Sequence, residues 1–213
     1  VQVFSSKGLN GMSAVWHAFI NDKIIPKKFQ GLARPTYLNS WEAYYFDVSE
    51  AGVVELAQKA SDIGVEMLVL DDGWFKGRDD DTSSLGDWFA DEKKFPNGIG
   101  SAAKRVRDMG LKFGVWFEPE MVSADSDLYR AHPQWVLQVP HRTLSTGRQQ
   151  LILDLSNSQV VEYLFERLDD CLSSGHIDYV KWDMNRTMTE LGSPAWSSTR
   201  QQEVAHRYML GVY

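Results

Sequence analysis

Residues 177–186, with the sequence IDYVKWDMNR, constrain the fold of this chain more than any other stretch. Ile177, Tyr179 and Val180 are the apolar, aromatic and β-branched residues that favour a buried parallel strand. The composition then changes abruptly to a lysine, a carboxylate, an amide and a guanidinium. In α/β proteins, functional side chains gather at the carboxyl ends of such strands. The stretch therefore predicts a parallel strand that ends in a polar site.

Segments of the same kind recur along the chain and alternate with helical patterns. One helical segment begins after Ser49, which can serve as its N-cap, and ends at Gly64. Strands are predicted over residues 35–41, 65–70, 111–117 and 150–155, and in the stretch at 177–186. Helices are predicted over residues 47–64, 99–109, 158–174 and 200–213.

This alternation predicts an α/β fold with a parallel sheet. A doubly wound nucleotide-binding sheet would carry a glycine-rich turn after its first strand, and neither GxGxxG nor a Walker sequence follows it. Carboxylates instead recur at the ends of the second to fifth strands, as around the mouth of a (β/α)8 TIM barrel. Because such a barrel needs about 250 residues, we expect residues 31–213 to form an incomplete barrel of about five β/α units.

Residues 1–30 do not have the pattern of a self-sufficient unit. The sequence VWHAFIN at 15–21 favours a strand, and Pro26 and Gly31 punctuate the polar stretch that follows. We expect this segment to be a linker into the barrel or the tail of an upstream domain.

Composition limits the classes of binding partner and the cellular compartment that we expect for this protein. The net charge of −7 argues against a polyanion, and against nucleic acid in particular. No apolar run approaches the roughly 20 residues of a membrane span, and the first residues lack the apolar core of a signal peptide. The single cysteine, Cys171, fits a reducing compartment. We therefore expect a cytoplasmic protein that binds neither nucleic acid nor membrane.

Five motifs occur in an order that resembles a known family. They are NSWEAYYFD at 39–47, LDDGWF at 70–75, GDW at 86–88, GVWFEPEMVS at 114–123 and YVKWDMNR at 179–186. Together they resemble the catalytic barrel of bacterial α-galactosidases of glycoside hydrolase family 36, the melibiase-like enzymes, over residues 19–186. Residues 1–30 then resemble the linker from the N-terminal β-sandwich domain of that family.

The resemblance implies retaining hydrolysis of terminal α-D-galactosides, such as melibiose and raffinose-type oligosaccharides, by double displacement. It makes Asp183 the nucleophile. The substrate-binding residues that it implies are Trp41, Asp71, Asp72, Trp116, Arg148, Lys181 and Asn185. The acid/base carboxylate of the family lies on a later strand, so the resemblance places it beyond Tyr213 and implies that the isolated 213-residue piece is inactive. It also implies no cofactor, and a homo-oligomer, often a tetramer.

Elementary chemistry is consistent with these roles. A retaining glycosidase needs two carboxyl groups about 5 Å apart, and the attacking one must stay ionised. Lys181 lies two residues before Asp183, on the same side of a strand, where its charge favours the carboxylate form. Asp71 and Asp72 precede Gly73, so they either turn both side chains toward one ligand or form an ordinary Asp-Gly turn.

A metal centre is a competing interpretation, because Asp71, Asp72, Glu118 and Glu120 offer hard oxygen ligands. The lysine and the arginine expected in the same mouth argue against it, so we predict no metal. We expect Glu118 and Glu120 to orient Trp116 or to support neighbouring groups. Two alternatives for the function remain open: a galactosyl transferase of raffinose-synthase type and a non-catalytic galactoside-binding fragment.

The eight tryptophans admit two interpretations. Indole rings at strand ends, such as those of Trp41 and Trp116, can stack on the apolar face of a sugar or pack in the core. Trp74 and Trp88 either border an outer subsite or anchor the long acidic loop over residues 75–97.

Overall fold

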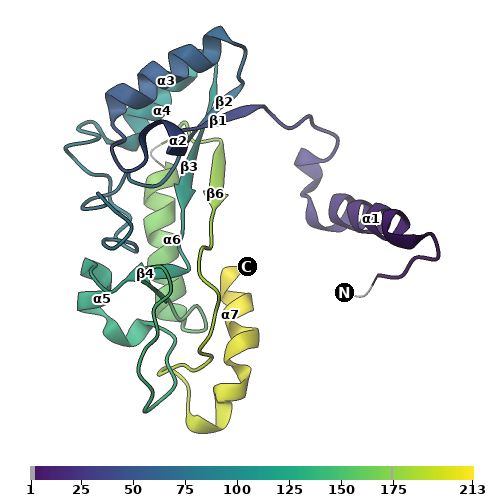
Figure 1. The fold of residues 1–213 in the computed structure, drawn as a ribbon, viewed down its shortest axis with the longest axis vertical. Helices are drawn as coiled ribbons and strands as arrows, with labels where there is room; N and C mark the ends of the chain where they lie inside the picture. The colour runs from purple at the N-terminus through teal and green to yellow at the C-terminus, as the bar shows by residue number, and fades with distance from the viewer. Residues whose placement is uncertain (1–2, 174) are drawn as a thin grey trace. The chain divides into compact units, whose positions relative to one another are not determined.

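The computed structural model describes residues 3–173 and 175–213. The chain divides into two compact units, Val1–Pro35 and Thr36–Tyr213, whose elements are labelled in Figure 1. No helix within the described ranges is long and apolar enough to cross a membrane.

The first unit is helical. Its elements are helix α1, Gly8–Phe19, a π-helical turn, η1, Ile20–Ile24, and a 3-10 turn, η2, Lys27–Phe29. The strand predicted over residues 15–21 is therefore wrong. Met12, Trp16 and Phe19 recur at helical spacing, and Trp16 packs edge-on against Phe19 with ring centroids 5.8 Å apart.

The second unit is built on a parallel sheet of four strands. They are β1 Tyr37–Asn39, β2 Met67–Leu70, β3 Lys112–Phe117 and β6 Tyr179–Trp182, in the order β1-β2-β3-β6. The register pairs Leu68 with Phe113 and Trp116 with Lys181. Because the four strands run in the same direction, their carboxyl ends share one edge of the sheet (Figure 1). The predicted α/β class and parallel sheet are confirmed.

Helices connect these strands at the predicted places. Helix α3, Glu50–Asp62, precedes β2, helix α4, Gly98–Asp108, precedes β3, and helix α6, Ser158–Ser173, precedes β6. The Ser49 side chain accepts a hydrogen bond of 3.2 Å from Gly52 N and so caps α3. Val53, Ala57 and Ala60 are buried along one side of this helix, as the apolar periodicity predicts.

The strand predicted over residues 150–155 does not belong to the parallel sheet. Strand β5, Gln150–Ile152, pairs antiparallel with β4, Met121–Ser123, and places Val122 opposite Leu151. The prediction of five parallel strands is therefore wrong, since the described residues place four in that sheet. An apolar run indicates a buried strand but does not specify its partner, and β4 lies close after β3 along the chain.

The long loop after β2 contributes aromatic residues to the core. Trp74, Phe75 and Trp88 are at most 3% exposed. Their rings contact one another and Phe117 with centroids between 4.8 and 6.1 Å apart. Trp74 and Trp88 therefore anchor this loop, which is one of their two predicted roles.

The remaining elements are α2 Trp41–Tyr44, α5 Asp127–Ala131, η3 Pro133–Trp135, η4 Ser198–Glu203 and α7 Val204–Val212. Glu120 links α7 to the end of β6. Its Oε2 accepts a hydrogen bond of 2.6 Å from the Tyr208 hydroxyl, and its Oε1 accepts one of 2.9 Å from Trp182 Nε1. These bonds give Glu120 a supporting role, although its contacts are with Tyr208 and Trp182 and not with Trp116.

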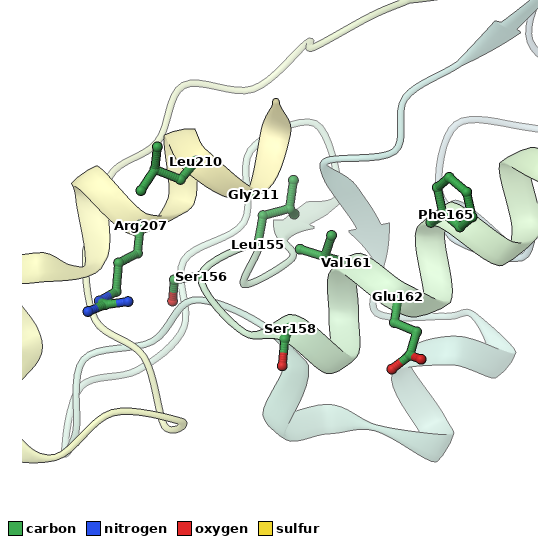
Figure 2. A pocket seen from close by; sticks show the side chains of 9 residues that line it. All are labelled: Leu155, Ser156, Ser158, Val161, Glu162, Phe165, Arg207, Leu210 and Gly211. Atoms are coloured by element: carbon green, nitrogen blue, oxygen red, sulfur yellow. The ribbon is translucent and has the colours of Figure 1, made fainter.

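An apolar cavity of about 550 Å³ lies between α6 and α7. Figure 2 shows Val161 and Phe165 on α6 and Leu210 on α7 around it. The other lining residues are Leu155, Ser156, Ser158, Glu162, Arg207 and Gly211. None of the predicted site residues lines this cavity.

Candidate active site

The eight residues predicted for the site line a single cavity of about 180 Å³. They come from the carboxyl-terminal parts of the four parallel strands, or just beyond them, and from the loop before β5: Trp41, Asp71, Asp72, Trp116, Arg148, Lys181, Asp183 and Asn185. The structure thus brings every predicted site residue together. Their roles toward a substrate remain predictions.

Five more residues line the same cavity: Phe46, Arg78, Asp81, Glu118 and Gln150. The sequence indicated only support for Glu118 and no role for the other four. Arg78 and Asp81 did have a signal, because a cation directly before three aspartates, GRDDD, follows the LDDGWF motif. Phe46 belongs to the NSWEAYYFD motif. Nothing in the sequence singles out Gln150, the first residue of β5.

Asp183 follows β6 directly and, among the carboxylates that line this cavity, accepts the most hydrogen bonds from uncharged donors. Its Oδ2 accepts hydrogen bonds of 3.0 Å from Trp116 Nε1 and Asn185 Nδ2, and its Oδ1 accepts one of 3.0 Å from Met184 N. Partial burial raises the pKa of Asp183, but these donors and the positive charge of Lys181 outweigh it, so the pKa is lowered overall. Asp183 is therefore ionised at neutral pH.

Lys181 forms its ion pair with Asp71 and not with Asp183. Its Nζ lies 2.8 Å from Asp71 Oδ2, and Asn39 Nδ2 donates to the same oxygen. The Asp71 N–H in turn donates to Ser40 Oγ at 2.9 Å. Asp71 is therefore held by Asn39 of β1, by Ser40 directly after β1, and by Lys181 of β6. The predicted influence of Lys181 on Asp183 is purely electrostatic: it helps to lower the pKa of that carboxylate without bonding to it.

Asp72 has a different partner, although it is adjacent to Asp71 in sequence. Arg78 Nη2 lies 2.8 Å from Asp72 Oδ2, and Arg78 Nε donates to Asp72 Oδ1 at 3.0 Å, a two-pronged ion pair. Gly73 N donates to Asp72 Oδ1 at 2.7 Å. Both charged side chains are almost completely buried, and the guanidinium lies 5.4 Å from the ring centroid of Phe46. The two aspartates are thus neutralised separately, one by Lys181 and one by Arg78.

The two predicted wall tryptophans differ in exposure. Trp116 is 2% exposed, stacks on Phe75 with ring centroids 6.5 Å apart and gives its Nε1–H to Asp183. Trp41 is half-buried and meets Tyr45 and Phe46 edge-on, with centroids 5.1 and 5.0 Å away. Trp41 therefore has the more accessible surface for a ligand, whereas Trp116 fixes the carboxylate.

Arg148 lies at the tip of a tight turn before β5. Gly147 and Gln150 exchange backbone hydrogen bonds of 3.2 and 3.0 Å, and the two central residues, Arg148 and Gln149, have φ angles of 52° and 60°. A two-residue hairpin turn of type I′ needs positive φ at both positions, which non-glycine residues adopt at a cost. Within the described residues the Arg148 side chain makes no hydrogen bond or ion pair, so its guanidinium is available to a ligand.

Glu118 follows β3 directly and is only 1% exposed. Its Oε1 accepts a hydrogen bond of 2.6 Å from Asn185 N, and its Oε2 accepts one of 3.0 Å from Gln150 Nε2. Burial raises the pKa of Glu118, the Asn185 donor opposes that effect, and the negative charges of Asp183 and Asp72 add to it, so the pKa is raised overall. The predicted contact between Glu118 and Trp116 is not present among its hydrogen bonds.

The contacts of the described residues do not favour a metal site. Across residues 3–173 and 175–213, no three His, Cys, Asp or Glu side chains are grouped so as to hold a metal ion. Asp71 is paired with Lys181 and Asp72 with Arg78, and Glu120 bonds to Trp182 and Tyr208.

The arrangement suits nucleophilic chemistry on a polar ligand. An ionised carboxylate held by neutral donors can attack an electrophilic carbon. The oxygens of Asp71 and Asp72 can accept hydrogen bonds from hydroxyl groups beyond those they already accept. Lys181 and Arg148 add donors in the same cavity. The fold and site together define a parallel α/β protein with a carboxylate-centred polar cavity at the carboxyl ends of its strands.

Comparison with known proteins gives the family. The melibiase family profile matches residues 1–213. Alpha-galactosidase AgaA of Geobacillus stearothermophilus is 52% identical over 213 residues, which is 100% of this chain and 29% of that protein. Alpha-galactosidase Mel36A of Lactobacillus acidophilus is 46% identical over the same shares of the two chains. This chain belongs to the melibiase family and spans about 29% of the length of these curated relatives.

Solved structures show the same fold. The crystal structure of the GH36 alpha-galactosidase AgaA from Geobacillus stearothermophilus matches with a TM-score of 0.92 at 52% identity, over 97% of this chain and 29% of that one. A variant of AgaA in complex with raffinose matches with a TM-score of 0.92 at 51% identity, over the same shares.

Proposed function

We propose that this chain carries the nucleophile half of an α-galactosidase active site that hydrolyses terminal α-galactosides with retention of configuration. The observation that carries the proposal is that Asp183, held by Trp116 and Asn185, lines one cavity with the Asp71–Lys181 and Asp72–Arg78 pairs. Relatives that are named alpha-galactosidases, and the raffinose complex of an AgaA variant, support raffinose-type oligosaccharides as the substrate class.

In the proposed first step, a carboxylate oxygen of Asp183 attacks the anomeric carbon of galactose. A bond forms between that oxygen and the carbon while the bond to the leaving oxygen breaks, and an acid protonates the leaving group. A water oxygen then bonds to the anomeric carbon while the bond to Asp183 breaks, and the conjugate base of that acid takes the proton of the water; Asp183 is freed and the original configuration is restored. Trp116 and Asn185 orient the carboxylate for both steps.

The other predicted residues bind the sugar in this proposal. Asp71 and Asp72 accept hydrogen bonds from galactose hydroxyls, and Lys181 and Arg148 donate to hydroxyl oxygens. The half-buried ring of Trp41 packs on an apolar face of the sugar. Asn185 contacts the substrate from the loop after β6.

We place the acid/base carboxylate outside residues 1–213. Besides Asp183, the cavity is lined by four acidic residues. Asp71 and Asp72 are bound to cations, and Glu118 is bound by amide donors. Asp81 is exposed on the loop after β2. The curated relatives are more than three times as long as this chain, so they have ample sequence to supply a second carboxylate.

The same proposal extends to architecture and assembly. The four parallel strands are taken as the first four of a (β/α)8 barrel, because the polar strand ends gather at one mouth. A tetrameric assembly, a cytoplasmic location and the absence of a cofactor stay predictions.

The nucleophile is tested in the parent protein, meaning the longest natural polypeptide that contains residues 1–213. Asp183→Ala is expected to lower turnover of an aryl α-galactoside by several orders of magnitude, because the attacking group is lost. Asp62→Ala, at an exposed helix end with a Gln58 contact, is the matched control and should keep wild-type turnover. Near-normal turnover in Asp183→Ala would refute the proposed mechanism, and release of the inverted sugar anomer would refute retention.

A further inference from the structure

Glu118 and Asp183 occupy equivalent places on adjacent strands. The register pairs Phe117 of β3 with Trp182 of β6, so the next residue of each strand, Glu118 and Asp183, begins the polar site. The Asp183 N–H donates to Phe117 O at 2.8 Å, which keeps the two strand ends together as far as this point. The two carboxylates therefore lie side by side at the edge of the sheet, and both line the cavity.

A continuous chain of hydrogen bonds runs from Gln150 to Asp183. Gln150 Nε2 donates to Glu118 Oε2 at 3.0 Å, and Asn185 N donates to Glu118 Oε1 at 2.6 Å. Asn185 Nδ2 then donates to Asp183 Oδ2 at 3.0 Å. Glu118 is thus the group that fixes the backbone of the residue whose side chain holds Asp183.

The Gln150 side chain shows that Gln150 donates to Glu118 and that Glu118 accepts. Its Oε1 is buried and makes no hydrogen bond within the described residues, and the whole residue is 1% exposed. Buried amide oxygens nearly always have a donor. A carboxylate has no proton to give when ionised, so Gln150 must turn its NH2 group toward Glu118 and leave its own oxygen unpaired.

We propose that Glu118, held by Gln150, is a positioning residue for the nucleophile: it keeps Asn185 in place as a donor to Asp183. The proposal rests on the proposed function, because it presumes that Asp183 attacks the sugar. Glu118 itself needs no contact with the substrate in this role.

The charges around Glu118 decide the order in which the two groups take up protons. Asp183 and Asp72 face it as like charges, and together with burial they raise its pKa above the ordinary glutamate value. The nearby cations are committed elsewhere, since Lys181 is bound to Asp71 and Arg78 to Asp72. The pKa of Asp183 is lowered. Glu118 therefore becomes protonated first as the pH falls.

Two further cations among the described residues, Arg186 and Arg148, lie near Glu118, and neither forms an ion pair with it that would make Asp183 take up a proton first. Arg186 Nη1 donates to the backbone oxygen of Gln150 at 3.1 Å, and its Nη2 lies 3.4 Å from Glu190 Oε2. Arg148 lines the cavity from the tip of its turn. Asp81, on the loop after β2, is the remaining acidic lining residue.

Glu118→Gln tests the role with little change of shape. The new amide oxygen can still accept from Asn185 N, and the new NH2 group can donate to Gln150 Oε1 once that amide turns over, which gives the unpaired oxygen a donor. A neutral acceptor binds more weakly than a carboxylate, so kcat is expected to fall by about two- to tenfold. The titration of Glu118 is also removed. The acid limb of the pH–rate profile therefore moves to lower pH and reduces to the single ionisation of Asp183.

Glu118→Ala removes both acceptors and leaves Asn185 N without a partner. Loss of a hydrogen bond to a charged group corresponds to about a 10- to 100-fold fall in rate, and KM should change far less because substrate contacts are kept. Glu120→Gln is the matched control: this glutamate also follows β3 and is buried, but it bonds to Trp182 and Tyr208. It should lower the melting temperature without moving the acid limb.

All variants are measured in the parent protein on an aryl α-galactoside, together with Asp183→Ala. If Asp183→Ala keeps its turnover, the proposed function fails first. If Asp183→Ala is inactive while Glu118→Gln keeps the wild-type acid limb and Glu118→Ala keeps wild-type kcat, the positioning role alone is overturned. Should Glu118→Ala not fold, the kcat of Glu118→Gln decides: a two- to tenfold fall in kcat with little change in KM supports the role, and a wild-type kcat overturns it.

Discussion

Two cavities of the second unit differ in size and in chemistry. The one between α6 and α7 has about 550 Å³ and is lined by four apolar side chains, two serines, Glu162, Arg207 and Gly211 (Figure 2). The one at the strand ends has about 180 Å³ and is lined by five carboxylates and three cationic side chains. In the smaller cavity Lys181 pairs with Asp71 and Arg78 pairs with Asp72, while Asp183 keeps neutral donors. The proposed function makes this cavity the active site, and cavity size alone would not single it out.

The buried ion pair of the small cavity gives the largest expected change in stability. Arg78→Met leaves the Asp72 carboxylate buried without its partner, which should lower the free energy of unfolding of the parent protein by about 3–5 kcal/mol. Urea unfolding followed by circular dichroism measures it. The double variant Asp72→Asn with Arg78→Met removes the unpaired charge and should recover part of the loss. A fall below about 1 kcal/mol for Arg78→Met would show that the pair is solvated.

The large cavity should respond through packing alone. A Cβ atom added at Gly211 would lie 1.9 Å from Leu155 O, so Gly211→Ala forces α7 away from the loop after β5. Such overpacking costs about 1–3 kcal/mol, measured as a lower melting temperature, while turnover of the folded protein stays unchanged. Leu210→Ala, at an exposed position on the same helix, is the control with little effect. A loss of kcat in folded Gly211→Ala would mean that the two cavities are coupled.

A smaller effect is expected on the pH dependence of kcat/KM, through Asp183, the proposed nucleophile. Trp116→Phe keeps an aromatic ring but removes one donor that lowers the pKa of Asp183. The carboxylate, which is present above its pKa and lost as the pH falls through it, should then protonate at a higher pH. The acid limb of kcat/KM should move to higher pH. Trp196→Phe, whose indole donates to Ser156, should leave that limb in place, and an unmoved limb in Trp116→Phe would exclude this donor as a cause.

The smallest effect is expected at the rim of the large cavity. Phe165 lines it but is 68% exposed, so Phe165→Ala should change the free energy of unfolding by no more than about 0.5 kcal/mol. Turnover should equal that of the wild type. A clear destabilisation would show that Phe165 is covered in the parent protein.

The sequence predicted those parts of the fold whose residue pattern is local. The apolar run before Asp71 and the capped helix after Ser49 form where their periodicity places them. The partner of a strand is not a local property, so the run at 150–155 was assigned to the wrong sheet. The stretch at 15–21 was interpreted as a strand, but it lies in helix α1 and the turn after it, where Met12, Trp16 and Phe19 recur at helical spacing.

The candidate site was predictable where polar residues follow a strand directly, because parallel strands bring those positions together. Asp71, Trp116 and Asp183 meet in one cavity for this reason. Arg78 and Gln150 reach the same cavity from a loop and from an antiparallel strand. Their side chains could be placed only by the tertiary structure, because nothing in their local sequence states which carboxylate they approach.

The turn that presents Arg148 has a consequence for protein engineering. Gln149 has a φ of 60°, and a left-handed conformation costs an ordinary residue about 1–2 kcal/mol. Asparagine tolerates that conformation better, and Gln149 does not line the cavity. Gln149→Asn is therefore a route to greater thermostability at the rim of the site, whereas the same relief at Arg148 would remove a cation that lines the cavity. Neighbouring positions of one turn thus separate a residue that can be changed for stability from one that the proposed function needs.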